Sequence, residues 1–371
     1  MCVTVGPMKK RFLTGQPWPA LGVLAGIAIL SVYAGLHLPP ALPPKAGEFD
    51  DIALYQIIVT RVRSGENYYA AAAAEQRAHG YPTRPAVAIR EPTEAWMLAT
   101  LSTETARRTA MLLLAAFTVF SLFYALEWQG ASPLKRVAGA VLATTGTVVS
   151  VTNPYVHEAW ASLLISSAVC VWRPGRYRAS VALAFTSCLF RELAVPVLLA
   201  MGACAALDRR WREVGAWCAA TVVFGMVVLI HLWFASHAAL PGDRVSPGWA
   251  AFGGWLFILA NARRNVAFHF LPAPLLSVVV ALALLGFLKA DGPIGRRIAT
   301  TTFTFVVLFW FVGRSDNDYW GVVYQSMLPL GLLYTPRLLR DSGLIEFLTG
   351  RPRGIVQVSS PLRSPRAPTD I

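Results

Sequence analysis

The segment "RPGRYRASVALAFTSCLFRELAVPVLLAMGACAALDRRWRE", residues 173–213, decides how this chain folds. Basic clusters at 173–178 and 208–213 flank an apolar stretch that is too long for one membrane span and short for two. The middle of the stretch carries an Arg191-Glu192 pair. If both basic clusters lie on one side of a membrane, the stretch must enter and return as two short helices that meet at this pair.

The composition extends this interpretation to the whole chain. Of its 371 residues, 55% are hydrophobic and 14% are charged, and the mean hydropathy is +0.51. A soluble domain carries about 25% charged residues. The composition therefore predicts an all-α polytopic membrane protein. The five cysteines lack metal-ligand spacing, and we interpret them as small core residues rather than a disulfide framework or a zinc site.

The apolar runs predict about ten transmembrane passes, with the 179–207 stretch counted as a short pair. The other predicted spans are 18–38, 109–127, 136–152, 156–172, 214–235, 270–288, 298–313 and 320–336. A basic cluster at 9–11, followed by an apolar run without a cleavage site, indicates a retained signal anchor. Residues 1–17 are then cytoplasmic, 18–338 form the membrane domain, and 339–371 form a cytoplasmic, partly disordered basic tail.

The distribution of charge supports this threading. With both termini in the cytoplasm, the inner segments hold 20 of the 33 Lys and Arg residues but only 7 of the 20 Asp and Glu residues. Cytoplasmic loops of membrane proteins carry such an excess of basic residues. The net charge of +13 is therefore explained by topology, and no nucleic-acid partner is expected.

The first outer loop, 39–108, is predicted to be an ordered subdomain on the membrane surface. Asp50 and Asp51 precede an amphipathic stripe that ends at Gly65, and a carboxylate suits a helix start. A second helix should end at Gly80 and a third should cover about 92–105. The simple interpretation of the two aspartates is a helix cap beside a solvated neighbour.

Other ionisable groups are expected at the same outer side. They occur as His157-Glu158, Arg191-Glu192 and the "DND" of residues 316–318. Ionisable residues at membrane depth are costly and usually mark a functional site, although Arg191-Glu192 can also be read as a structural ion pair between helix tips. The DND motif is only a weak match to the metal-binding DxD of soluble glycosyltransferases. We therefore predict no metal ligands, and a divalent cation remains an alternative.

One chemistry suits outward-facing carboxylates and arginines near the headgroup level. Arginines can hold the phosphate of a lipid-linked sugar by bidentate hydrogen bonds, and a carboxylate can take the proton from an attacking hydroxyl. The candidate base is Asp50 or Asp51, with Asp50 preferred. The candidate substrate-binding residues are Tyr55, Arg63, Arg90, His157, Glu158, Arg191, Glu192, Arg263, Arg264, Asp316, Asp318 and Tyr319, among which Arg191 is the preferred phosphate ligand.

Two motifs resemble a known family. The run Asp50, Asp51, Tyr55, Gly65, Asn67, Tyr68, Tyr69 and the segment "FRELAVP" at 190–196 are similar to motifs of bacterial mannosyltransferase-like proteins of the GT-C superfamily. The resemblance covers about 18–336 in topology. It implies an inner-membrane, multi-pass, inverting glycosyltransferase with a polyprenyl-phosphate sugar donor, a lipid or envelope-glycan acceptor and a first-loop aspartate as base.

Two other functions fit the same sequence features. A transporter or flippase of a lipid-linked or anionic substrate would use the Arg191-Glu192 pair as a gate. An envelope polysaccharide polymerase or ligase would differ mainly in using an oligosaccharide donor. The aspartate pair favours an enzyme, because transporters bind their substrates near the midplane, whereas Asp50 and Asp51 are expected at the outer interface.

Overall fold

A computed structural model describes residues 18–38 and 49–342 of the protein. In these ranges the regular elements are helices joined by loops. Within these ranges the only extended pairing is an isolated bridge between Arg84 and Val245. The all-α prediction is therefore confirmed for this part of the chain. The expectations for the cytoplasmic amino terminus, for 39–48 and for the tail from residue 343 fall outside it.

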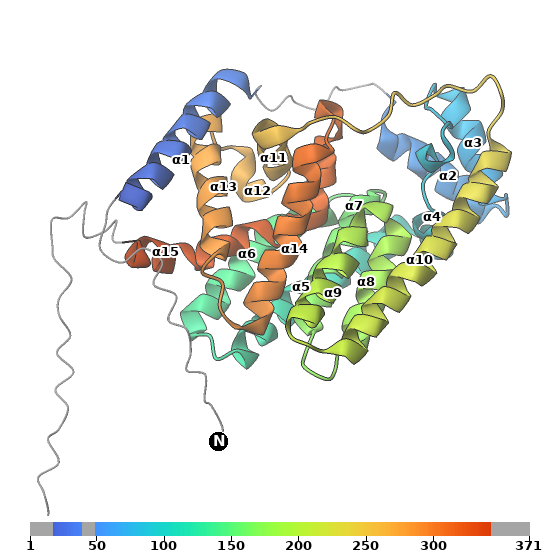
Figure 1. The fold of residues 1–371 in the computed structure, drawn as a ribbon. Coiled ribbons are helices and arrows are strands. Elements are labelled where there is room, and N and C mark those ends of the chain that lie inside the picture. The colour runs from blue at the N-terminus through green and yellow to red at the C-terminus, as the bar shows by residue number, and fades with distance from the viewer. Residues whose placement is uncertain (1–17, 39–48, 343–371) are drawn as a thin grey trace, which may run out of the picture.

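Figure 1 shows how the helices are arranged. The α-helices are α1 (Trp18–His37), α2 (Asp51–Arg63), α3 (Tyr68–Ala78), α4 (Thr93–Thr100), α5 (Glu104–Trp128), α6 (Pro133–Val151), α7 (His157–Val171), α8 (Arg178–Phe190), α9 (Val195–Leu207), α10 (Trp211–Ala238), α11 (Gly254–Ala262), α12 (Val266–His269), α13 (Ala273–Phe287), α14 (Gly292–Phe311) and α15 (Thr335–Asp341). Short 3₁₀ segments are η1 (Ala86–Ala88), η2 (Glu192–Ala194), η3 (Ser315–Tyr324) and η4 (Leu328–Leu333).

Two of the described helices, α5 and α10, are long and apolar enough to cross a membrane when judged by length and composition alone. Four shorter apolar helices, α7, α8, α9 and α13, and the apolar part of α1 lie where the sequence predicts other spans. These helices hold a shared core that runs through the bundle.

The segment 173–213 folds as two short helices joined by a break. Helix α8 ends at Phe190, Arg191 takes an extended conformation (φ −156°, ψ 117°), and α9 begins at Val195. The guanidinium of Arg210 lies 5.0 Å from the ring centre of Trp172, so the two basic clusters meet at one end of the bundle. The prediction of two short helices joined at Arg191-Glu192 is confirmed, and the turns that flank them share the lower edge of Figure 1.

Polar residues gather at two opposite ends of the bundle. At the first, which we call the basic end, Arg296 and Arg297 pair with Asp208 at 3.0 and 2.9 Å, and Lys135 pairs with Asp291 at 3.1 Å. These residues come from the turns that the sequence assigns to the inner side. The other end, the cavity end, collects the segments assigned to the outer side.

The segment 320–336, predicted as a transmembrane helix, is not an α-helix, and this prediction is wrong. The chain instead runs through η3 and η4, and residues 320–331 are buried without a break. The segment still joins the cavity end to the basic end, because Asp341 of the following α15 pairs with Lys289 at 2.9 Å. Side chains of other segments satisfy some of its backbone hydrogen-bonding groups. For example, Asn265 Nδ2 donates to the Gln325 carbonyl at 3.1 Å.

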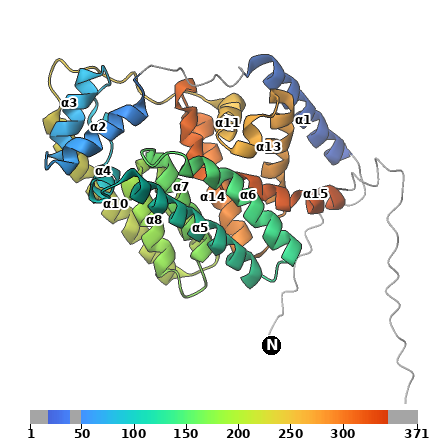
Figure 2. The same ribbon diagram turned by 180° about the vertical axis from the view of Figure 1, so that it is seen from behind.

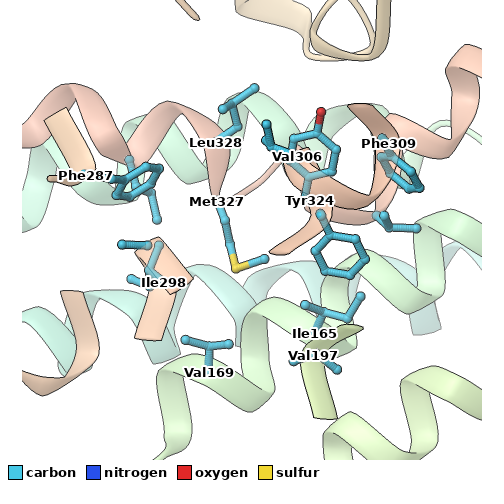
Figure 3. Packing of buried hydrophobic residues seen from close by; sticks show 14 of the residues in the cluster. Ile165, Val169, Val197, Phe287, Ile298, Val306, Phe309, Tyr324, Met327 and Leu328 are labelled. Atoms are coloured by element: carbon cyan, nitrogen blue, oxygen red, sulfur yellow. The ribbon is translucent and has the colours of Figure 1, made fainter. Parts of the chain in front are cut away.

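Close backbone approach explains why this segment is not an ordinary helix. A Cβ on Gly331 would lie 1.9 Å from the Ala283 carbonyl oxygen, and one on Gly321 would lie 2.5 Å from the Asn261 Cβ. The two glycines let η3 and η4 press directly against α11 and α13. Figure 3 shows Tyr324, Met327 and Leu328 of the segment enclosed by core side chains of neighbouring helices.

Helices α2, α3 and α4 form a small subdomain beside the upper half of α10, as both ribbon views show (Figures 1 and 2). Asp50 begins α2, Asn67 begins α3, and Gly65 and Gly80, which follow these helices, have positive φ values of 94° and 72°. The predicted third helix is shorter than expected, because α4 ends at Thr100 and α5 already begins at Glu104. The hydrophobic core of the subdomain continues into α5 and α7, so the subdomain packs directly on the bundle.

Candidate functional site

A polar cavity of about 850 Å³ opens at the cavity end, between the α2–α4 subdomain and the segment 314–319. Its ionisable lining residues include Asp51, His79, Arg90, Arg244, Arg314 and Asp316. Aromatic side chains lie among them, contributed by Phe49, Tyr55, Tyr81, Trp249 and Tyr319. A concave site of this size with converging polar groups is the usual form of a ligand pocket.

A second, larger cavity, which we call the apolar groove, has a volume of about 1010 Å³. It lies among α1, α11, α12 and the segment that follows α14, and its apolar wall includes Leu38, Phe252, Leu256, Phe257, Val266 and Phe270. Arg263, Arg264 and Arg314 line it as well. Arg314 and Ser315 belong to both linings, so the apolar groove and the polar cavity meet at these two residues.

The two aspartates at the start of α2 have different positions. The Asp50 carboxylate accepts a hydrogen bond from the Ala53 backbone N–H at 2.9 Å and caps the helix. Asp51, one residue later, lines the polar cavity, whereas Asp50 does not. The expectation that Asp50 faces inward is therefore wrong, because one residue on a helix turns the side chain by about 100°.

Arg90 links the polar cavity to buried charges. Its guanidinium lines the cavity, lies 3.4 Å from a Glu192 carboxylate oxygen, and is 3.5 Å from the Tyr319 hydroxyl. The Tyr68 hydroxyl donates to the Arg90 carbonyl at 2.8 Å and holds this part of the backbone. Arg90 therefore presents a positioned positive charge to any ligand in the polar cavity.

Behind Arg90 lies a group of ionisable residues that we call the buried charge network. It comprises the buried Glu91, Glu94, His157, Glu158 and Arg191 together with the partly exposed Arg90 and Glu192. Arg191 is fully buried, donates to Glu158 at 2.5 Å and also bonds Glu192. The preferred phosphate ligand of the sequence analysis therefore already has two carboxylate partners and does not line either cavity.

The network holds more carboxyl groups than arginines, and the first-loop carboxyls Glu91 and Glu94 respond to this. Burial raises the pKa of Glu94 well above its usual value, with the nearby Glu158 raising it further and Arg191 opposing. Burial and the neighbouring Glu192 likewise raise the pKa of Glu91. The raised pKa values of Glu91 and Glu94 favour their neutral forms, which reduces the excess of negative charge in the network.

This arrangement predicts how stability depends on pH. A raised carboxyl pKa means that the folded state binds the proton more tightly than the unfolded state, so the stabilisation is full below the unfolded pKa and is lost as pH rises through the folded pKa. We expect Glu94→Gln, which is neutral at every pH, to weaken the decline of the melting temperature with rising pH. Thermal unfolding of the purified protein from pH 5 to 9 measures this.

The matched control is Glu127→Gln, at an exposed carboxylate that pairs with Arg136 near the basic end. This change leaves the buried charge network intact, so the pH profile should keep the wild-type slope. An unchanged slope in Glu94→Gln would show that Glu94 is ionised in the folded protein.

The "DND" motif does not converge on one point. Asp316 lines the polar cavity and accepts from Arg314 at 2.5 and 2.7 Å, whereas Asp318 lines the apolar groove and accepts from Arg264 at 2.5 Å. Asn317 is buried between them. Within residues 18–38 and 49–342, no group of three or more His, Cys, Asp or Glu side chains is placed to hold a metal ion.

Of the remaining predicted substrate-binding residues, some lie in or beside the two cavities and one lies elsewhere. Arg263 and Arg264 line the apolar groove, and His157 lies beside the polar cavity, with its ring 4.6 Å from that of Tyr55 and its Nδ1 3.1 Å from Glu94. Arg63 lies elsewhere: it is exposed and donates to the Ser102 carbonyl at 2.8 Å.

The sequence analysis missed Glu91, Glu94, Trp249 and Arg314 as site residues. Glu94 lies in the first turn of α4, whereas Glu91 precedes the helix, so no helical spacing links the two carboxyls. Trp249 and Arg314 carry no such signal either, since each reaches the polar cavity from an irregular segment. No family model, no curated protein and no solved structure matches this chain.

Proposed function

We propose that this protein is an integral membrane glycosyltransferase of the GT-C type. It transfers a sugar from a polyprenyl-phosphate donor to a lipid or envelope-glycan acceptor on the extracytoplasmic face, with inversion at the anomeric carbon. The observation that carries the proposal is the meeting of an apolar groove and a polar cavity at Arg314. A substrate that fills both must join an apolar chain to a polar head.

The charges at the junction fit an anionic link between chain and head. Arg264 and Arg314 line the groove, and their guanidinium groups are oriented by Asp318 and Asp316. Planar guanidinium groups bind phosphate oxygens by paired, charge-assisted hydrogen bonds. The phosphate of the donor would lie at this junction, with the lipid chain in the apolar groove and the sugar in the polar cavity.

Asp51 is the base in this mechanism. The acceptor hydroxyl attacks the anomeric carbon, the bond between that carbon and the phosphate oxygen breaks, and polyprenyl phosphate leaves with the electron pair. The hydroxyl proton passes to the Asp51 carboxylate, which lines the same cavity. Attack from the face opposite the leaving phosphate inverts the configuration. The guanidinium groups of Arg264 and Arg314 would supply hydrogen-bond donors to the phosphate oxygens.

The proposal also places the chain in a bacterial inner membrane with about ten passes. Two helices satisfy the length and apolarity of a span, and the positive residues of the short turns lie at the basic end. Irregular backbone at membrane depth is tolerated where protein surrounds it. The buried course of residues 320–331 meets this condition.

Cysteine labelling tests this orientation. With Cys218, the exposed native cysteine among the described residues, and Cys2 replaced by serine, single cysteines at Ser64 or Gly242 should react with an impermeant reagent in intact cells. A cysteine at Gly175, in a turn of the basic end, should react only after permeabilisation. External labelling at Gly175 would overturn the ten-pass topology.

A donor series tests the lipid site directly. Membranes that contain the protein should transfer label from a long-chain polyprenyl-phosphate sugar with a lower KM than from a farnesyl-phosphate sugar, because each buried CH₂ contributes about 0.8 kcal/mol. Phe270→Ser, at an 83% exposed side chain of the apolar groove, should raise KM for the long donor only. Phe120→Ser, 62% exposed and outside the groove, is the matched control. Equal use of both donors would contradict the assignment of the groove.

A further inference from the structure

The polar cavity has a second neighbour on the side away from the apolar groove. A small pocket of about 420 Å³, which we call the strap pocket, is lined by Arg77, Leu240, Gly242 and Asp243. It shares Gly80, Tyr81 and Arg244 with the polar cavity, whereas the apolar groove shares only Arg314 and Ser315. A ligand in the polar cavity can therefore extend in two directions, into the apolar groove or into the strap pocket.

The wall between the polar cavity and the strap pocket is fixed by many hydrogen bonds. The irregular segment 239–253 crosses from α10 to α11, and Asp243 within it accepts from Arg77 at 2.6 and 2.8 Å and from Thr83 at 2.6 Å. The Ser246 N–H donates to the Arg84 carbonyl at 2.7 Å, and Arg244 Nη1 donates to the Gly80 carbonyl at 2.8 Å. The path toward the strap pocket is therefore preformed.

Aromatic rings line the polar cavity, and Tyr81 among them also lines the strap pocket. Trp249 and Tyr81 line the polar cavity, and Phe49 stacks on the His79 ring at 3.6 Å with an interplanar angle of 5°. An aromatic ring offers an apolar face beside polar groups, which suits the alternating CH and hydroxyl faces of a sugar ring. Arg244 adds guanidinium donors to the lining of the polar cavity, and the Gln76 side-chain oxygen adds an acceptor.

We infer that the polar cavity and the strap pocket together bind an extended oligosaccharide as the acceptor. The inference rests on the proposed function, and it selects a glycan over a second lipid as the group that receives the sugar. A volume of about 850 Å³ lies near the top of the range for pockets that enclose drug-sized ligands, roughly 300–1,000 Å³. It therefore has room for more than one sugar unit, and the strap pocket continues it beside the charged side chains of Arg77, Asp243 and Arg244.

Direct binding tests the inference without any need for turnover. The full-length protein in lipid nanodiscs is titrated with α-1,6-mannotriose, maltotriose and cellotriose, each against its monosaccharide, by saturation-transfer NMR. We expect at least one trisaccharide to bind at least tenfold more tightly than its monosaccharide. Trp249→Ala and Arg244→Ala should each weaken that binding by about tenfold, and Trp249→Tyr, which keeps a ring, should retain most of it.

Matched controls are Trp233→Ala and Arg108→Ala, at exposed side chains outside both cavities. Equal affinity for trisaccharide and monosaccharide would overturn the extended site, as would full binding in the Trp249→Ala protein. Absence of saccharide binding would also overturn it. Failure of the proposed function is distinguishable, because in that case trisaccharides bind as expected while no polyprenyl-phosphate sugar is turned over.

Discussion

Asp51→Asn is expected to lower the rate of sugar transfer by about 10²–10⁴, the typical contribution of a general base. This loss corresponds to roughly 3–5 kcal/mol of transition-state stabilisation, since each factor of ten is about 1.4 kcal/mol. The physical reason is that the amide cannot accept the proton of the attacking hydroxyl. The variant should fold normally, because Asp51 is exposed to the polar cavity and makes no cap.

Asp50 provides the control for this prediction. Asp50→Asn keeps a good N-cap residue, and Asp50→Ala should cost about 1 kcal/mol of stability while transfer continues. Initial rates with a labelled polyprenyl-phosphate sugar, normalised to the amount of folded protein, separate the two roles. Near-full transfer by Asp51→Asn would remove Asp51 from the mechanism. A large loss in Asp50→Asn alone would restore the preference that the sequence suggested.

The pair shows what sequence could and could not predict about the site. The sequence placed a helix start at Asp50-Asp51, and the structure confirms it. It could not assign the two orientations, because both residues are compatible with the first turn and differ only by a rotation about the helix axis. Which of the two aspartates faces the polar cavity depends on where that cavity lies. Its position is set by segment 314–319, which is more than 260 residues later in the chain.

The fold likewise has features that neighbouring residues predict and features that depend on residues far away in the sequence. The break at Arg191 and the glycines after α2 and α3 are local signals, and each was predicted. The course of 320–331 was not, because an apolar run has the same hydropathy whether it forms an α-helix or a buried 3₁₀ path. Gly321 and Gly331 permit the close packing, but only the facing backbone of Asn261 and Ala283 requires it.

Arg191 yields the largest expected loss of stability. Arg191→Met should destabilise the fold by roughly 3–5 kcal/mol, the usual cost of removing one partner of a buried ion pair. The cost arises because Glu158, almost fully buried, would lose its arginine partner, and Glu192 would keep only Arg90 at 3.4 Å. SDS-titrated unfolding of the purified protein measures the change. An exposed pair offers the matched control, since breaking Arg108–Glu104 should cost at most about 1 kcal/mol.

The same variant distinguishes two roles for Arg191. If it only neutralises its neighbours, the double change Arg191→Met and Glu158→Gln should recover much of the lost stability, since Glu192 then keeps Arg90 as its partner and Glu158 no longer carries a charge. If Arg191 binds the donor phosphate, as the sequence suggested, Arg191→Met should raise the donor KM while the free energy of unfolding stays within about 1 kcal/mol of wild type. The structure favours the first outcome, because the guanidinium is enclosed by two carboxylates and Arg90, not Arg191, lines the polar cavity.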